Sequence, residues 1–208
     1  MESRFGKVKR QHIPYTHVGI VHEKLSTGAG YKLHQAPFVS QIRPIKIERG
    51  DLDTRSLTAS ELTSLRSVLG ALLYATITRA DVCAGICLAA SKICEATVKQ
   101  LRDINSVLAI AHANPEHGLI FRSLAPPLMV LSISDSSYST SSTSYAVEGH
   151  LVLLMSCADA CFKEGTREGH FLDGPCHLLS HGSHKASRIS HSTSHAEALA
   201  HWTASQHA

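Results

Sequence analysis

Two carboxylates stand where they could hold a metal ion or act on a substrate. Asp135 follows the apolar run Leu128–Ser134, a predicted strand, and it stands among serines. A carboxylate at the end of a strand can reach a metal or a substrate without entering the core, although aspartate at such a place also caps turns. Glu197 lies early in a predicted helix, Ala196–Ala204, where Ser194-x-x-Glu197 also fits a capping box. The residues alone leave both interpretations open.

Histidines and cysteines offer a second possible metal chemistry. Eight of the fifteen histidines follow Glu168, and His191-x3-His195 has a spacing that can bind a metal on one helix face. Cys157-x3-Cys161 and Cys176-His177 could be combined into a zinc site, but a second tight cysteine pair is missing. The alternative is a set of exposed or hydrogen-bonding histidines and of free thiols.

Charge and missing motifs bound the class of function. Residues 1–50 carry nine Lys or Arg against three Asp or Glu, whereas the rest of the chain carries eleven against fourteen. This basic N-terminal segment favours contact with nucleic acid, for which Lys7, Lys9 and Arg10 are the candidates, although a solvated basic face explains the charge equally well. The chain has no dinucleotide-binding glycine motif, no P-loop and no nucleophile elbow.

No secretory signal opens the chain, and its apolar runs are too short to cross a bilayer. The sequence therefore predicts an intracellular protein, cytoplasmic or nuclear, with no membrane partner.

Helices are expected in the middle of the chain. Short strands are predicted at Thr16–His22 and Tyr31–Leu33, followed by a polar linker, Pro44–Arg55. Thr58-x-x-Glu61 is a capping box that predicts a helix over Ala59–Tyr74. Apolar spacing predicts two more helices and a short strand, over the ranges Ala80–Ala96, Thr97–Ala111 and Leu119–Arg122. The second helix would place Cys83, Cys87 and Cys94 on one face.

The second half reads as three strands and a helix. After a boundary at Ala125-Pro126-Pro127, strands are predicted at Leu128–Ser134, Tyr145–Met155 and Cys176–Ser180, and Ala196–Ala204 is the helix. A serine- and threonine-rich turn and an irregular charged loop separate the strands. The fold class is therefore α/β, more specifically α+β.

Several motifs resemble the Pol polyprotein of copia-type retrotransposons. The run Leu65–Asp81, with Thr78-Arg79-Ala80-Asp81 at its end, is similar to the segment that follows the polymerase core, although Ala80 replaces the usual proline. Leu101–Phe121, with its Gly-Leu-x-Phe exit, resembles the next helix of that family. Phe5-Gly6-Lys7 and Pro14–Gly19 resemble the end of the reverse transcriptase domain.

The second half resembles the start of the family's ribonuclease H domain. Ile133–Tyr138 looks like its opening strand, and Lys185–Leu199 looks like its Ser-Ser-x-Glu-Ala-Glu helix. The resemblance implies that Asp135 is the first catalytic aspartate and Glu197 the catalytic glutamate, both as ligands of Mg²⁺. It also implies two parts, a thumb- or connection-like region over residues 1–122 and a partial ribonuclease H-like unit over 123–208.

The resemblance implies an enzyme family but predicts an incomplete site. Such nucleases hold two Mg²⁺ ions about 3.5–4 Å apart, which requires more oxygen ligands than two side chains supply. The family's later aspartates and its polymerase aspartates have no counterpart here, so we expect neither activity from this segment and at most weak Mg²⁺ binding. The expected partners are an RNA–DNA hybrid and the rest of the polyprotein. The alternatives are a non-catalytic nucleic-acid-binding protein derived from such an element and a His/Cys metal-binding module.

Overall fold

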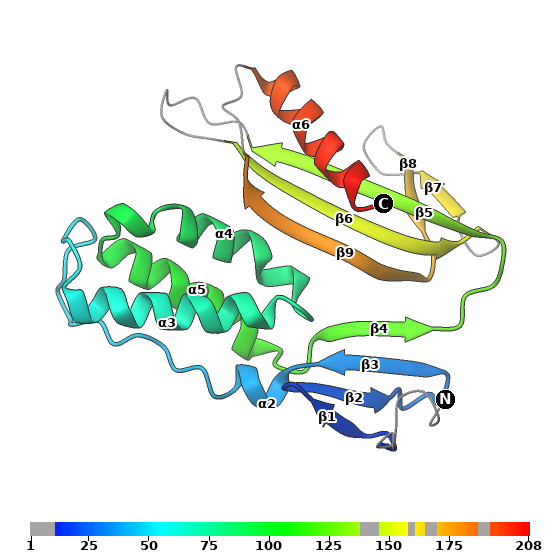
Figure 1. Ribbon diagram of the computed structural model, residues 1–208, viewed down its shortest axis with the longest axis horizontal. Coiled ribbons are helices and arrows are strands. Elements are labelled where there is room, and N and C mark those ends of the chain that lie inside the picture. Colours follow the sequence, from blue (N-terminus) through cyan, green and yellow to red (C-terminus); the bar gives the residue numbers. More distant parts are fainter. Residues whose placement is uncertain (1–10, 138–145, 158–160, 165–169, 187–191) are drawn as a thin grey trace, which may run out of the picture.

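The computed structural model describes residues 11–137, 146–157, 161–164, 170–186 and 192–208, with the backbone alone for 161–164 and 170–173. It is a mixed α+β arrangement of two larger antiparallel sheets, with a helical bundle beside them and a last helix on the second sheet (Figure 1). Among the helices of these described residues, none combines the length and the apolar character needed to span a bilayer.

The first sheet has the order β1-β2-β3-β4, and all its pairs are antiparallel. Its strands are β1 (Tyr15–His17), β2 (Ile20–Lys24), β3 (Gly30–His34) and β4 (Gly118–Arg122). The single strand predicted over residues 16–22 is wrong, because Val18 and Gly19 have φ of 46° and 71° and turn the chain back on itself. Two consecutive residues with positive φ form the tight hairpin turn that matches the twist of its strands.

A short helix, α2 (Ala36–Val39), leads to an extended segment and then to a bundle of three helices. These are α3 (Ala59–Ala75), α4 (Cys83–Ser91) and α5 (Val98–Ala113). The capping box at Thr58 and Glu61 is confirmed, with both reciprocal hydrogen bonds present. The predicted helix over residues 80–96 is broken into η1 (Ala80–Val82), α4 and η2 (Ile93–Glu95). Cys83 and Cys87 therefore lie half-buried in α4, whereas Cys94 is exposed in η2.

Leucines of α3 and apolar residues of α5 form the main core. The side chains of Leu65, Leu72, Leu101 and Ile104 are fully buried there, and α4 adds Ile86. The i, i+3 and i+4 spacing places these residues on one face of each helix, and burial of that face holds the bundle together.

The second large sheet has the order β5-β6-β9 and is also antiparallel. Its strands are β5 (Leu128–Ser137), β6 (Val147–Ser156) and β9 (Cys176–Lys185). Helix α6 (Thr193–Gln206) packs on β5 and β6, and α4 packs on β9 and β6 from the other side (Figure 1). The sheet therefore lies between the last helix and the bundle.

The predicted order of three strands followed by a helix is confirmed in these elements. The stretch that was expected to be an irregular loop contains a further hairpin, β7 (Cys161–Glu164) with β8 (His170–Asp173).

Arg79 ties the ends of the bundle together from a buried position. Its side chain is 1% exposed, and it donates two hydrogen bonds to the Asp81 carboxylate, at 2.9 and 2.8 Å. Its Nη1 donates to the carbonyl oxygens of Ala111 and Asn114, at 2.9 and 3.1 Å, where α5 ends. These bonds hold the pKa of Asp81 below its ordinary value of 3.8, although partial burial opposes the shift. A planar guanidinium with five donors suits such a set of acceptors, and an ammonium does not.

We expect Arg79→Leu to lower the free energy of unfolding by about 3 kcal/mol, because it leaves the buried Ala111 carbonyl oxygen and the Asp81 carboxylate without the donors that Arg79 supplies. Urea denaturation measures the change. Arg79→Lys is expected to lose part of the same stability, since it keeps the charge and loses the planar fork. The control is Lys99→Met, which breaks an exposed pair with Asp103 and is expected to cost less than about 0.5 kcal/mol. Equal costs at positions 79 and 99 would contradict this role of Arg79.

Candidate functional site

Asp135 lies within β5 and not after the end of the strand as expected, because β5 continues to Ser137. Its side chain is exposed, and Oδ1 accepts a hydrogen bond from the Ser136 backbone N at 2.9 Å. Asp135 pairs with Gly149, and Gly149 pairs with Ser183, so these three residues point to the same face of the sheet.

This face looks toward the helical bundle. Ile133, Leu151 and His181 lie on it, two positions from the Asp135 row, and His181 donates from Nε2 to the Thr76 carbonyl oxygen at 2.8 Å. A cavity of about 240 Å³ lies between this face and the start of α4, and Asp135 and Cys83 are among the residues that line it. Burial raises the pKa of the Cys83 thiol, so this cysteine is not prepared as a nucleophile.

Glu197 lies on α6, and its side chain is exposed. The proposed capping box with Ser194 is wrong, because the helix begins two residues earlier than that motif requires. Ser192 is the N-cap, and its side chain accepts a hydrogen bond from the His195 backbone N at 3.1 Å. Glu197 is thus the fifth residue of the helix, beyond the reach of the cap.

Asp135 and Glu197 lie on opposite sides of the sheet. Thr203 of α6 donates to the Glu148 carboxylate at 3.0 Å, so α6 covers the face to which Glu148 points. Glu148 pairs with Ser136, and Asp135, as the neighbour of Ser136, points to the other face. The structure therefore separates the two predicted ligands by the thickness of a sheet. Within the described residues, no group of three or more His, Cys, Asp or Glu side chains is arranged to hold a metal ion.

The remaining candidates are only partly within the described residues. Lys7, Lys9 and Arg10 lie outside them, as does His191. Cys157 and Cys176 are exposed free thiols. His177 accepts a hydrogen bond at Nε2 from the Arg122 backbone N at 2.9 Å, which joins β9 to β4.

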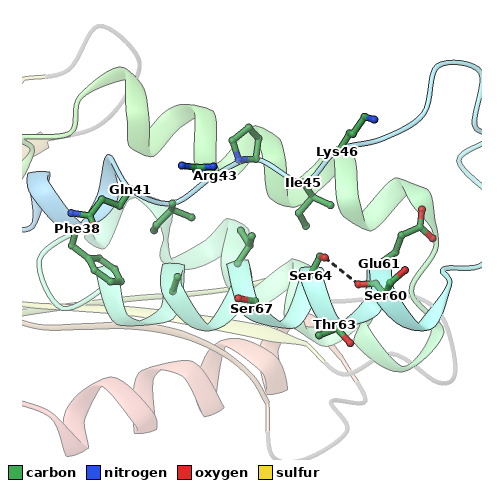
Figure 2. A pocket seen from close by; sticks show the side chains of 14 residues that line it. Phe38, Gln41, Arg43, Ile45, Lys46, Ser60, Glu61, Thr63, Ser64 and Ser67 are labelled. Carbon is green, nitrogen blue, oxygen red and sulfur yellow. Dashed lines mark hydrogen bonds between the residues drawn. The ribbon is translucent and has the colours of Figure 1, made fainter.

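A groove that the sequence analysis missed runs between α3 and the extended segment after α2. Its volume is about 740 Å³. Figure 2 shows the segment running alongside α3, with Phe38 and Ile45 directed toward the helix. The α3 side of the groove carries short side chains that leave the space open: Ser60, Thr63, Ser64, Ser67 and Ala71.

Asn105 holds the extended segment in place above the groove. Its side-chain amide accepts from the backbone N of Ile45 and donates to the Ile45 carbonyl oxygen, both at 2.8 Å. These two hydrogen bonds pair with the backbone N–H and C=O of Ile45 as a neighbouring β-strand would, and they fix the segment to α5. No signal in the sequence indicates it, because residues 60 apart in the chain form it and Pro44–Arg55 reads as a linker.

The groove carries positive charge on its rim. Arg43 and Lys46 are exposed there, and Lys46 lies 3.4 Å from the Glu48 carboxylate in an exposed pair. Glu61, the acidic residue of the lining, is neutralised by Arg55 at 2.6 Å. The hydrogen bond from Arg55, together with those from Thr58, lowers the pKa of Glu61 to about 2.

We expect Mg²⁺ titration to give no coupling between Asp135→Asn and Glu197→Gln. Because the two side chains lie on opposite faces, each substitution is expected to act independently, with a coupling free energy below about 0.5 kcal/mol. Calorimetric titration of the two single variants and the double variant measures it. A bound Mg²⁺ that either single substitution abolishes, with no further loss in the double variant, would show a shared site.

Comparisons with known proteins return no relative of this chain. No protein-family model, no curated protein and no solved structure matches it significantly. Support for a function therefore comes from the residues, from the arrangement of sheets and helices, and from the motifs described above.

Proposed function

We propose that this chain is a segment of a copia-type retrotransposon Pol polyprotein and that it contacts an RNA–DNA hybrid. In this proposal residues 1–122 belong to the end of the reverse transcriptase region, and residues 123–208 to the start of a ribonuclease H-like domain. The segment on its own holds nucleic acid and does not cleave it.

The order of elements supports this origin. A helical bundle carries the Thr78-Arg79-Ala80-Asp81 motif after the end of α3 and in η1, and it is followed by the three-stranded sheet β5-β6-β9, with the β7–β8 hairpin inserted before β9, and then by α6. The motif has a structural reason in this chain, since the buried Arg79 pairs with the more exposed Asp81 and also donates to the Ala111 carbonyl oxygen of α5.

The groove between α3 and residues 41–46 is the observation that carries the proposed contact. Hydroxyl groups of α3 and the cations Arg43 and Lys46 line one continuous surface, and such groups bind the phosphate and sugar oxygens of nucleic acids. Pairing of Glu61 with Arg55 offsets the negative charge of the groove lining, and the exposed pair of Lys46 with Glu48 leaves Lys46 accessible to solvent. The short side chains of α3 allow a backbone to approach closely.

The separation of Asp135 from Glu197 supports binding without cleavage. Mg²⁺ demands near-octahedral oxygen ligands at about 2.1 Å, so side chains on opposite faces of a sheet do not share one ion. A hydrolytic site of this class needs two such ions held together. The segment is therefore proposed to supply a binding surface, with Mg²⁺ bound weakly or not at all.

We expect the segment to bind an RNA–DNA hybrid with an affinity that falls as salt rises. In the double variant Arg43→Gln/Lys46→Gln, the slope of log affinity against log salt is expected to decrease by about 2, because two phosphate contacts are lost. The affinity is measured by fluorescence anisotropy of a labelled hybrid at several salt concentrations between about 50 and 200 mM, and the slope is taken from these affinities.

The matched control is Lys99→Gln/Arg102→Gln, which removes two cations from α5 outside the groove lining. Its slope is expected to equal that of the unchanged protein. If both double variants bind like the unchanged protein, the groove is not the contact surface. Absence of any salt-dependent binding would overturn the proposed function itself.

A further inference from the structure

Helix α6 is held on the sheet by a seam of small residues. Its buried side chains are Ala196, Ala200 and Ala204, and Ala196 packs with Ala146 and Ala186. Alanine methyl groups bury little apolar area, so this seam by itself holds the helix weakly. The polar contacts between α6 and the sheet therefore have a large share in keeping the helix in place.

The first polar contact joins the last turn of α6 to β6. Glu148 is 4% exposed, and its Oε2 accepts a hydrogen bond from Thr203 of α6 at 3.0 Å. The same oxygen lies 3.2 Å from Nε2 of His184 on β9. The carboxylate is thus already engaged from both neighbouring elements.

The second contact is a stacked pair of imidazoles at the end of α6. His150 of β6 and His207, directly after α6, have parallel rings with centroids 4.4 Å apart and an interplanar angle of 6°. His150 is 7% exposed, whereas the outer face of His207 is open to solvent. Gly182 of β9 makes room for the His150 ring, because a Cβ there would lie 2.7 Å from its Cε1.

Among the described residues, no carboxylate pairs with the buried ring, because Glu148, two residues away on β6, is engaged by Thr203 and His184. Its Nε2 lies 3.3 Å from the Ser180 hydroxyl, and within the described part of the chain its Nδ1 has no hydrogen-bond partner. A protonated imidazole would bring a second N–H to this buried position, where nothing accepts it, and burial of an unsatisfied donor is costly.

The other groups around His150 are themselves histidines or are already occupied. β9 contributes His184, with ring centroids 6.4 Å away, and His181 on the opposite face of the sheet. β5 contributes the neutral Ser134, which pairs with His150, and β6 contributes Glu148 two residues away. Burial is the main cause that lowers the pKa of His150, and repulsion from His207, His184 and His181 adds to it.

We propose that the stacked pair His150 and His207 is a pH-sensitive latch that holds α6 on the sheet when both rings are neutral and releases the helix in mild acid. Protonation of His150 places a charge in a buried position, and protonation of both rings sets like charges face to face with centroids 4.4 Å apart. The undocked state binds a proton at His150 more readily than the docked state does. Docking of α6 is therefore favoured at pH values above the ordinary histidine pKa of about 6.5, and it is lost as the pH falls below that value.

The experiment is hydrogen exchange of the whole chain, followed by mass spectrometry at pH 7.5 and 5.5 and corrected for the intrinsic rate. The opening of residues 193–206 is expected to increase between these pH values, by at most about tenfold per pH unit for one proton. Helix α5 is the internal reference and is expected to stay protected. Loss of protection in α5 together with α6 would mean global unfolding and would overturn the latch, as would unchanged protection of α6.

Two variants test the assignment to the stacked pair. His150→Phe keeps a ring that fits beside Gly182 but removes the titration, so the acid-induced opening of α6 is expected to disappear. His207→Phe changes an exposed position, is the safer substitution for folding, and is expected to reduce the opening. The control, His201→Phe, replaces an exposed histidine on the same helix and is expected to open as the unchanged protein does. A wild-type response in His150→Phe and His207→Phe, or a lost response in His201→Phe, would contradict the proposal.

Discussion

The buried guanidinium of Arg79 is the interaction on which the arrangement of the helices depends. It lies where α3 ends, pairs with Asp81 in η1 and donates to carbonyl oxygens at the end of α5. A buried charge of this kind is tolerated only when its donors are matched by acceptors, which here come from two elements. The site therefore fixes how α3 and α5 meet and where α4 begins.

The bundle that Arg79 holds together supports the second sheet on one side and the groove on the other. α4 starts directly after η1 and packs against β9, while His181 reaches the end of α3. On the other side of the bundle, Asn105 of α5 clamps the extended segment above α3 and so forms the walls of the groove. A single ordered bundle thus supports both the second sheet and the proposed nucleic-acid surface.

The predictable parts of the fold are those that short-range chemistry decides. Thr58 and Glu61 satisfy each other's backbone donors within four residues, so the start of α3 could be read from the sequence. The hairpin at Val18 could not, because a valine with positive φ is an unusual choice that only its surroundings enforce. The capping box considered for Ser194 and Glu197 does not form, because Ser192, two residues earlier, is the N-cap of α6.

The relation between the candidate carboxylates depends on long-range register. The sequence places Asp135 on a strand and Glu197 on a helix, but it does not say which face of the sheet the helix covers. A shift of one residue in the pairing of β5 with β6 would reverse the face of every side chain on the strand. The groove could not be predicted from the sequence for a similar reason, because its wall is held by the hydrogen bonds between Asn105 and Ile45, which are 60 residues apart in the chain.

The most direct test of the proposed function is a hydrogen-exchange footprint of the chain with and without an RNA–DNA hybrid at neutral pH. The structure-based proposal predicts protection on binding in residues 41–46 and in α3, on both walls of the groove. Residues of β5 and α6 are expected to exchange at the same rate in both samples. Protection confined to β5 and α6, or no protection anywhere under conditions where the hybrid is bound, would contradict the account.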